Sequence, residues 1–322
     1  MTAGAVFVDG LYKSFGSSGL FAKWEKRVPV LKGINFELAP GELAALVGES
    51  GSGKTTIGRC LMGLLPIEQG SIRVNGYNVN ELRGKDDKAF RLSAQMVFQN
   101  PYASLNPAFR GRDALLEAVR IHDRSISRHV ARKEVEKLAK MVQLPLQRLD
   151  EYPTSLSGGE KRRVIFARAL ATNPSFIVTD EPVSGLDQPI QTQLLDLLRQ
   201  IHEKQKTTMV FISHDLRLVR YLSTRVMVLL HGRIVEDAPA ESFFGSTGPA
   251  HPYSQELLAS AFNPHPMLAG SRVRKPPAGG EVGCSFRHRC KFARMGSEGE
   301  CDNIIPELKE IGLKHRVACH CI

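Results

Sequence analysis

Several features of membrane and secreted proteins are missing from this sequence of 322 residues. No apolar run approaches the 18 or more residues that a membrane-spanning helix requires, and the best candidates are short stretches such as 226–230. The first residues contain no basic segment leading into an apolar one, so we expect no secretory signal. These absences predict a cytoplasmic protein that does not cross a membrane by itself.

Cysteine is scarce over most of the chain and concentrated at its end. Cys60 stands alone, and the other five are Cys284, Cys290, Cys301, Cys319 and Cys321. The cytosol keeps thiols reduced, so this cluster favours metal or redox chemistry over disulfides. The C-x₂-C pairs of zinc ribbons are absent, and four irregularly spaced thiolates suit an iron–sulfur cluster at least as well as zinc. A cluster, a zinc site and an unligated tail all stay open on the residues alone.

The composition excludes disorder and a fibrous fold, since apolar residues make up 42% and charged residues 24% of the chain. At about 150 residues per domain, the length predicts two domains. Lys and Arg outnumber Asp and Glu by 43 to 33, a formal charge of +10. That excess is compatible with nucleic acid, with an anionic membrane surface, or with solubility alone.

Short apolar runs alternate with helix-period segments, which predicts an α/β fold with a largely parallel sheet. The runs suit strands buried on both faces and lie at 43–47, 96–98, 176–178, 209–212 and 226–230. Helical patterns lie at about 112–122, 127–143, 157–171, 189–203 and 215–222. The segment from 101 to 156 has no clear strand, so we expect an inserted helical subdomain at about 101–165.

Proline and glycine are frequent from 263 to 282, which predicts a linker without regular structure. We therefore divide the chain into a main domain at 1–262, the linker at 263–282 and a Cys-rich extension at 283–322.

Gly48-Glu49-Ser50-Gly51-Ser52-Gly53-Lys54-Thr55 matches the phosphate-loop pattern G-x-x-x-x-G-K-S/T, between an apolar run and a helical pattern. The glycines let successive N–H groups turn toward a polyphosphate at the helix N-terminus. Lys54 adds a charge for the terminal phosphates, and the Thr55 hydroxyl can bind Mg²⁺. We count Thr56 with this nucleotide-binding segment. The alternative is a chance flexible loop.

Asp180 and Glu181 end an apolar run at 176–179. Such a pair is commonplace and usually only solvated, but an enzyme that hydrolyses nucleoside triphosphates needs an acid on the metal side. We assign Asp180 to Mg²⁺ and Glu181 to the attacking water as general base.

Ser157-Gly158-Gly159-Glu160 has two interpretations. Ser157 and Glu160 fit a capping box that starts a helix. Two glycines at a helix start cost about 1 kcal/mol each relative to alanine, so N–H groups exposed for an anion would explain them.

These motifs together resemble the nucleotide-binding subunit of an ABC transporter. The resemblance covers about 1–262 and rests on the phosphate loop, Gln99, 156–160, Asp180-Glu181, Ser184-Gly185-Leu186-Asp187 and His214. The segments 99–107 and 181–184, with the cysteine tail, narrow it to the oligopeptide/dipeptide importer ATPases. Thr179, Gly185 and 161–163 depart from the family pattern without removing a reactive group.

By this resemblance, Phe15 stacks on adenine, Gln99 senses Mg²⁺ and the membrane subunits, and His214 contacts the γ-phosphate. An aromatic after a first strand is, however, more often part of the core. Ser157, Gly158 and Gly159 of one subunit would close over ATP on the phosphate loop of another.

The resemblance also implies a 4Fe-4S cluster on Cys284, Cys290, Cys301 and Cys319, with Cys321 as a spare, in a role outside ATP chemistry. The implied partners are a second ATPase subunit in a heterodimer, two transmembrane permease subunits and an extracytoplasmic solute-binding protein, without nucleic acid. The chain would hydrolyse MgATP on the cytoplasmic face of the inner membrane to drive peptide import. The alternative is a soluble nucleic-acid-associated ABC ATPase with an iron–sulfur tail. The separation of 103 positions from Lys54 to Ser157 disfavours it, since a repair-type ATPase carries a long coiled coil there.

Overall fold

The computed structural model describes residues 4–16, 27–100, 104–122, 125–262, 282–293 and 299–322. The expected linker at 263–282 lies outside these residues except for Val282. Residues 101–103, at the start of the expected helical subdomain, also lie outside them.

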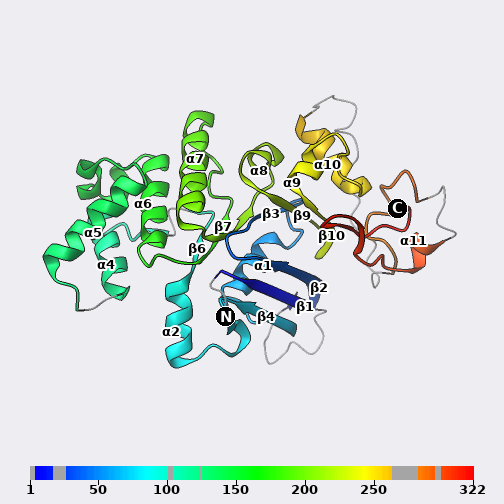
Figure 1. Cartoon of the computed structure of the whole chain (residues 1–322), viewed down its shortest axis with the longest axis horizontal. Coiled ribbons are helices and arrows are strands. Elements are labelled where there is room, and N and C mark those ends of the chain that lie inside the picture. The colour runs from blue at the N-terminus through cyan, green and yellow to red at the C-terminus, as the bar shows by residue number, and fades with distance from the viewer. Residues whose placement is uncertain (1–3, 17–26, 101–103, 123–124, 263–281, 294–298) are drawn as a thin grey trace.

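The described strands fall into two sheets (Figure 1). One is antiparallel, in the order β2 (Val28–Leu38), β1 (Val6–Phe15), β4 (Gln69–Val74) and β5 (Tyr77–Asn78). The main sheet has the order β11 (Lys309–Gly312), β12 (His315–Val317), β10 (Arg233–Pro239), β9 (Arg225–Leu230), β3 (Leu43–Val47), β8 (Thr208–Ile212), β7 (Phe176–Asp180) and β6 (Ala94–Val97). The five strands from β9 to β6 are parallel, as the sequence predicted.

The described helices cover both faces of the main sheet. The α-helices are α1 (Lys54–Leu61), α2 (Gly84–Ser93), α4 (Gly111–His122), α5 (Arg128–Met141), α6 (Gly158–Leu170), α7 (Gln188–Gln205), α8 (Leu216–Leu222), α9 (Ala240–Phe244), α10 (Pro252–Phe262) and α11 (Glu300–Asn303). Short 3₁₀ turns are η2 (Val79–Glu81), η3 (Leu146–Asp150) and η4 (Pro153–Ser155). None of these helices is long and apolar enough to span a membrane.

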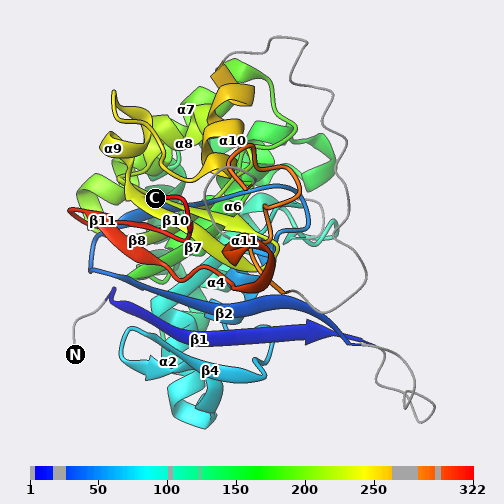
Figure 2. The same cartoon turned by 90° about the vertical axis from the view of Figure 1, so that its right-hand side faces the viewer.

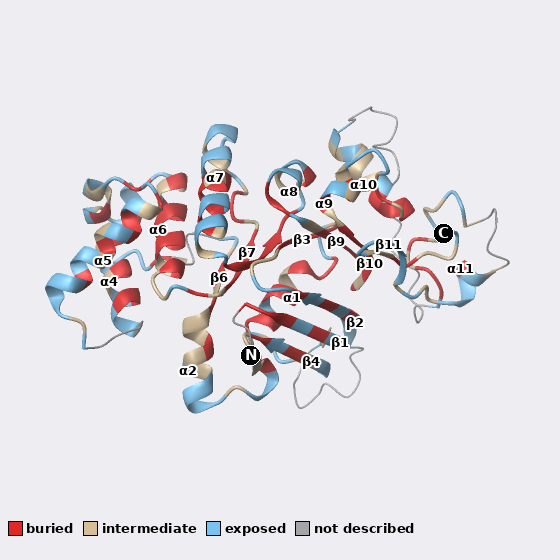
Figure 3. Ribbon diagram, in the orientation of Figure 1, coloured by how far each residue is buried: buried red, intermediate tan, exposed pale blue. Residues whose placement is uncertain are grey.

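The continuous apolar runs serve two cores, one on each face of the sheet. Along β3, Leu43, Ala45 and Val47 enter one buried cluster, whereas Ala44 and Leu46 enter the other. Successive side chains of a strand point to opposite faces, so a strand between two cores needs apolar residues at every position. Figure 3 shows β3, β7 and β9 as a continuous buried layer.

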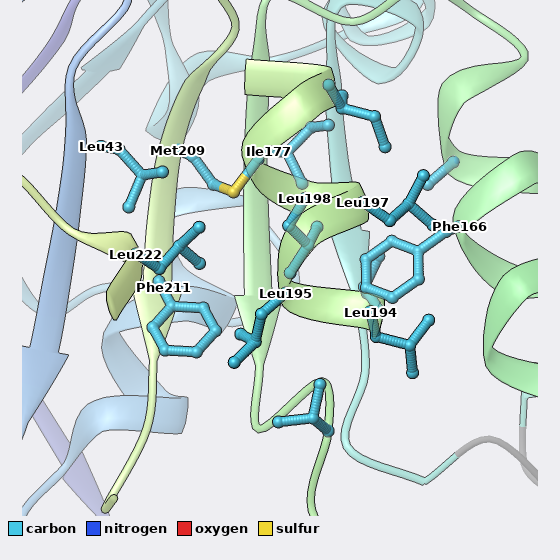
Figure 4. Close-up of a cluster of buried hydrophobic side chains, with 14 of the residues drawn as sticks. Leu43, Phe166, Ile177, Leu194, Leu195, Leu197, Leu198, Met209, Phe211 and Leu222 are labelled. Carbon is cyan, nitrogen blue, oxygen red and sulfur yellow. The ribbon is translucent and has the colours of Figure 1, made fainter. Parts of the chain in front are cut away.

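One core lies between the main sheet and α7. Leu194 and Leu198 of α7 pack with Ile177 of β7 and Phe211 of β8 (Figure 4). All four side chains are nearly inaccessible to water, and burial of each contributes about 1.5–3 kcal/mol. The other core contains α1 and the antiparallel sheet, which forms a separate layer on the side away from α7 and α8 (Figure 2).

The C-terminal extension adds strands to the main sheet, which the sequence did not predict. β12 pairs with β10 in an antiparallel register. Two buried acids of β10 pair with basic residues of β12. His315 lies 2.8 Å from Glu236, and Arg316 lies 2.5 Å from Asp237. These pairs attach the extension to the core of the protein.

Candidate active site

The phosphate loop connects the buried strand β3 to α1, and its glycines are there for two different reasons. Gly48 has φ 147°, and a Cβ at this position would overlap the carbonyl oxygen of Leu229. Gly53 has φ 112°, and its Cβ would lie 2.8 Å from Leu31. Gly51 has φ 80° but open space around it. The loop therefore needs glycine for backbone conformation throughout and for close packing at its two ends.

Lys54 lies inside this loop at the first position of α1. Its ammonium donates to the carbonyls of Gly48 and Glu49, both at 2.8 Å. Burial lowers the pKa of Lys54, and the nearby carboxylates of Glu181, Asp180 and Glu49 oppose that effect. A buried cation held by two backbone carbonyls and, at 3.5 Å, by the Ser52 hydroxyl has uncharged partners and is suited to bind an anion.

Thr55 and Asp180 come together from α1 and the end of β7. The Thr55 hydroxyl donates to Asp180 Oδ1 at 3.1 Å. Burial raises the pKa of Asp180, the hydrogen bond from Thr55 lowers it, and Glu181 raises it further. A hydroxyl and a buried carboxylate in contact supply the oxygen ligands that Mg²⁺ prefers. These residues fit the metal that the sequence assigned to them.

Glu181 follows β7 directly and is held on both carboxylate oxygens. Gln99 donates to Oε2 at 2.8 Å, and His214 Nδ1 lies 2.8 Å from Oε1. The backbone of Glu181 has φ 45°, a left-handed conformation that costs about 1 kcal/mol or more for a non-glycine residue. Three residues separated by up to 115 positions therefore converge at the carboxyl ends of β6, β7 and β8.

Arg162 is a site residue that the sequence did not indicate. It is buried in α6, and its guanidinium donates to the carbonyl of Ser184 at 2.7 Å and to that of Gln99 at 3.4 Å. A further contact at 3.5 Å reaches the carbonyl of Glu181. The run of three basic residues at 161–163 gave no usable signal, because such a run is usually solvated, whereas all three side chains are buried in the structure.

Ser157 starts α6 through the capping box that the sequence indicated. Its hydroxyl accepts from the Glu160 N–H at 3.3 Å, and the Glu160 carboxylate accepts from the Ser157 N–H at 2.8 Å. The glycines have a packing reason as well. A Cβ on Gly158 would lie 3.0 Å from Leu186, and one on Gly159 would lie 2.8 Å from Ile190.

Residues 157–160, called the signature from here on, and the phosphate loop occupy different parts of the molecule. The helix α6 packs with α4 and α5, whereas the phosphate loop lies at β3, which β8 and β7 separate from β6 in the main sheet (Figure 1). Ser157 is exposed at the start of α6. The structure thus brings the phosphate loop, Asp180, Glu181, Gln99 and His214 together, and it leaves Ser157 exposed in another part of the molecule.

Phe15 ends β1 and is 43% exposed, with the ammonium of Lys13 at 5.5 Å from the ring centre. The alternative that this aromatic belongs to the core is therefore wrong. Tyr12 instead packs against the backbone, since a Cβ on Gly33 would lie 2.9 Å from its hydroxyl.

The tail cysteines gather in one region without forming disulfides. All six cysteines are free thiols, and the Cys284 N–H donates to the Cys301 carbonyl at 2.8 Å. Burial raises the pKa of Cys319, and charge on Cys284, Cys290 or Cys301 raises it further, which shows that these sulfurs lie within electrostatic range. In the described residues, no group of three or more His, Cys, Asp or Glu is arranged to hold a metal ion.

Comparison with known proteins identifies two matching families. Residues 31–184 match the ABC transporter family, and residues 235–296 match the C-terminal region of oligopeptide/dipeptide transporters. The chain is 37% identical to the di/tripeptide transport ATP-binding protein DppF of Pseudomonas aeruginosa, over 94% of this chain and 93% of that protein. It is 40% identical to the oligopeptide transport ATP-binding protein OppF of Streptococcus mutans, over 77% and 80%.

A solved structure has the same fold. The dimeric structure of a post-hydrolysis state of the ATP-binding cassette MJ0796 bound to ADP and Pi superposes with a TM-score of 0.66 at 26% identity, covering 73% of this chain and 98% of that one.

Proposed function

This chain belongs to the ATP-binding subunits of the oligopeptide/dipeptide ABC importers, and from that premise we propose how its residues bind and hydrolyse MgATP. It is an ABC transporter ATPase that energises peptide import. The observation that carries the residue assignment is the convergence of Gln99 and His214 on Glu181, beside the contact between Thr55 and Asp180.

In our proposal the phosphate loop, 48–56, binds the polyphosphate, and Lys54 exchanges its carbonyl partners for phosphate oxygens. Thr55, Gln99 and Asp180 hold Mg²⁺, which supplies charge neutralisation at the phosphates. Phe15 provides an exposed ring for the adenine base.

Glu181 acts as the general base. Its carboxylate receives the proton of the attacking water, and Gln99 and His214 hold both carboxylate oxygens in position for that transfer. His214 also contacts the γ-phosphate. Such positioning matters because a general base must lie within hydrogen-bond reach of the proton that it removes.

The signature of this chain completes the ATP site of another subunit, which is a second copy of this chain or a homologous subunit. Ser157 and the N–H groups of Gly158 and Gly159 lie at the start of α6, where the helix dipole favours an anion. Closure of this segment over ATP on the partner's phosphate loop would complete the site, and the related cassette is dimeric with ADP and Pi bound.

The remaining partners follow from the family. We propose a heterodimer with a second ATPase subunit, two permease subunits and an extracytoplasmic solute-binding protein, with this chain at the cytoplasmic face of the inner membrane. The domain division at 262 and 283 and the helical subdomain at about 101–165 belong to the same proposal. The nucleic-acid-associated alternative gains no support from the relatives named above, which are peptide transport proteins.

We propose further that Cys284, Cys290, Cys301 and Cys319 hold a 4Fe-4S cluster. A single zinc ion needs its four sulfurs at about 2.3 Å from one point, which brings them to about 3.8 Å from one another. A cluster binds each thiolate to a different iron, so it suits thiols that are near one another without meeting at one point. The thiols of the extension are free for either arrangement, and we favour the cluster because of the family resemblance and the lack of C-x₂-C pairs.

The ATP site is tested with Lys54→Ala and Glu181→Gln. We expect Lys54→Ala to lose nucleotide binding in a fluorescent ATP titration. Glu181→Gln should bind normally while its turnover falls about 10²–10⁴-fold. Lys137→Ala and Glu203→Gln, at exposed positions of α5 and α7, are the matched controls. Near-normal hydrolysis by Glu181→Gln would remove Glu181 from the mechanism.

The shared site is tested by dilution. Specific ATPase activity should rise with protein concentration, or on addition of the partner ATPase subunit. Ser157→Arg should abolish the ATPase activity of the chain but leave its affinity for nucleotide unchanged. Full activity of a demonstrated monomer would contradict the shared site.

The cluster is tested by iron, acid-labile sulfide and zinc analysis after anaerobic purification. We expect about four irons and four sulfides per chain, and their loss in Cys284→Ser, Cys290→Ser, Cys301→Ser and Cys319→Ser. Cys60→Ala, outside the extension, is the control. One zinc without sulfide would replace the cluster by a zinc site, and unchanged iron in Cys319→Ser would move the fourth ligand to Cys321.

A further inference from the structure

The extension touches the phosphate loop directly. Arg289 lies 240 positions after Glu49, and its guanidinium donates to the Glu49 carboxylate at 2.8 Å. The same guanidinium reaches Glu256 of α10 at 2.5 Å.

A second contact holds the same loop residue from the core side. The hydroxyl of Tyr253, at the start of α10, accepts from the Glu49 N–H at 2.9 Å. The guanidinium of Arg289 lies over the rings of Tyr253 and Phe286, at 6.0 and 5.4 Å from their centres. Tyr253 and Phe286 are buried, and the Arg289 side chain is only 18% exposed.

All three polar groups of Glu49 are therefore occupied. The carboxylate accepts from Arg289, the N–H donates to Tyr253, and the carbonyl accepts from Lys54 at 2.8 Å. Glu49 immediately follows Gly48, the residue at which the loop leaves β3. Its orientation consequently sets the direction in which the following N–H groups point.

We propose that Arg289 is a positioning residue of the ATP site, which holds the phosphate loop through Glu49 in its anion-binding conformation. The inference rests on the proposed role of this loop in nucleotide binding. It assigns the extension a function in ATP affinity, in addition to any metal that its thiols bind.

The surroundings of the Arg289–Glu49 ion pair explain why it holds the phosphate loop more firmly than an exposed ion pair would. Exposed pairs contribute little because solvent screens them and the side chains lose entropy. Here the guanidinium is confined between two aromatic rings and two carboxylates, so it has lost its freedom in the folded protein already. An arginine suits this place because its planar group can stack and bind both carboxylates at once.

The test compares Arg289→Gln, Arg289→Lys and Glu49→Gln in the full-length protein. We expect Arg289→Gln and Glu49→Gln each to raise the Kd for a fluorescent ATP analogue about threefold to tenfold, the range of an ordinary net hydrogen bond, because the pair acts on ATP only indirectly. Arg289→Lys should recover part of the loss. The double variant should bind no more weakly than either single variant, because the two residues act through one contact.

In the ATPase assay at high protein concentration, Arg289→Gln and Glu49→Gln should raise the KM for ATP and leave kcat unchanged. A general loss of folded protein would not produce this result. The matched control is Arg287→Gln, since the polar contacts of the Arg287 side chain among the described residues are with the Cys284 carbonyl and Asp302, both within the extension.

Two failures are distinguishable. If Lys54→Ala binds nucleotide like the wild type, the proposed function of the loop is wrong. If Lys54→Ala loses binding but Arg289→Gln and Glu49→Gln behave like Arg287→Gln, only the present inference is wrong. Should Arg289→Gln not fold, Glu49→Gln decides, because it leaves every residue of the extension in place.

Discussion

Alanine at Gly48 and at Gly51 separates the two reasons for glycine in the phosphate loop. Both residues have positive φ, 147° and 80°, so either substitution strains the backbone. Only the Gly48 substitution also places a methyl group onto the Leu229 carbonyl, in the strand next to β3. The two variants have the same chemistry and differ in the space around the new atom.

We expect Gly51→Ala to cost about 1–2 kcal/mol, the usual penalty for a left-handed L-residue. Gly48→Ala adds the cost of overpacking, about 1–3 kcal/mol, because the obstacle is backbone in a fully buried sheet and cannot rotate away. The total for Gly48→Ala is thus about 2–5 kcal/mol.

Urea unfolding at pH 7 measures both changes in the free energy of unfolding, and nucleotide titration of the folded fraction measures the effect on binding. Gly48→Ala should also impair ATP binding more than Gly51→Ala, since it displaces the start of the loop. Equal free energies of unfolding for the two variants would refute the argument from close packing.

Two further predictions concern ion pairs that hold other parts of the molecule. Asp237→Asn should destabilise the protein by about 3–5 kcal/mol in urea unfolding, because Arg225 and Arg316 would lose their buried counter-charge; the exposed Asp302→Asn should be near neutral. Arg148, with help from the Ser157 N–H, lowers the pKa of Glu160 to about 2 from an ordinary 4.5, so this carboxylate stabilises the fold above pH 4.5 and less as the pH falls toward 2. Glu160→Gln should therefore cost about 1–2 kcal/mol at pH 7, after allowance for solvent exposure, and progressively less below pH 4.5. A cost that is the same at pH 7 and pH 3.5 would contradict the assignment.

The strands of the main sheet were predictable because a strand between two cores must be apolar at every position. The runs at 43–47, 176–178, 209–212 and 226–230 lie in β3, β7, β8 and β9. The antiparallel sheet was not predicted, since its strands have one exposed face and their register shifts at bulges, which break the alternating pattern. The addition of β12 to the main sheet was missed because its three residues are too short to form a pattern.

The sequence by itself determined the local chemistry of the ATP site. A phosphate loop works through the conformations of consecutive residues, so its glycines, Lys54 and Thr55 must appear at fixed spacing in any chain that builds one. The same holds for Asp180 and Glu181 at the end of a buried strand.

Only the tertiary structure decided which distant residues support these groups. The packing of α6 onto the carboxyl ends of the strands makes Arg162 a partner of the Gln99 and Ser184 carbonyls. The attachment of the extension to β10 allows Arg289 to reach Glu49. Such contacts depend on how whole elements pack. The residues next to an arginine in the sequence do not indicate which distant group its guanidinium contacts.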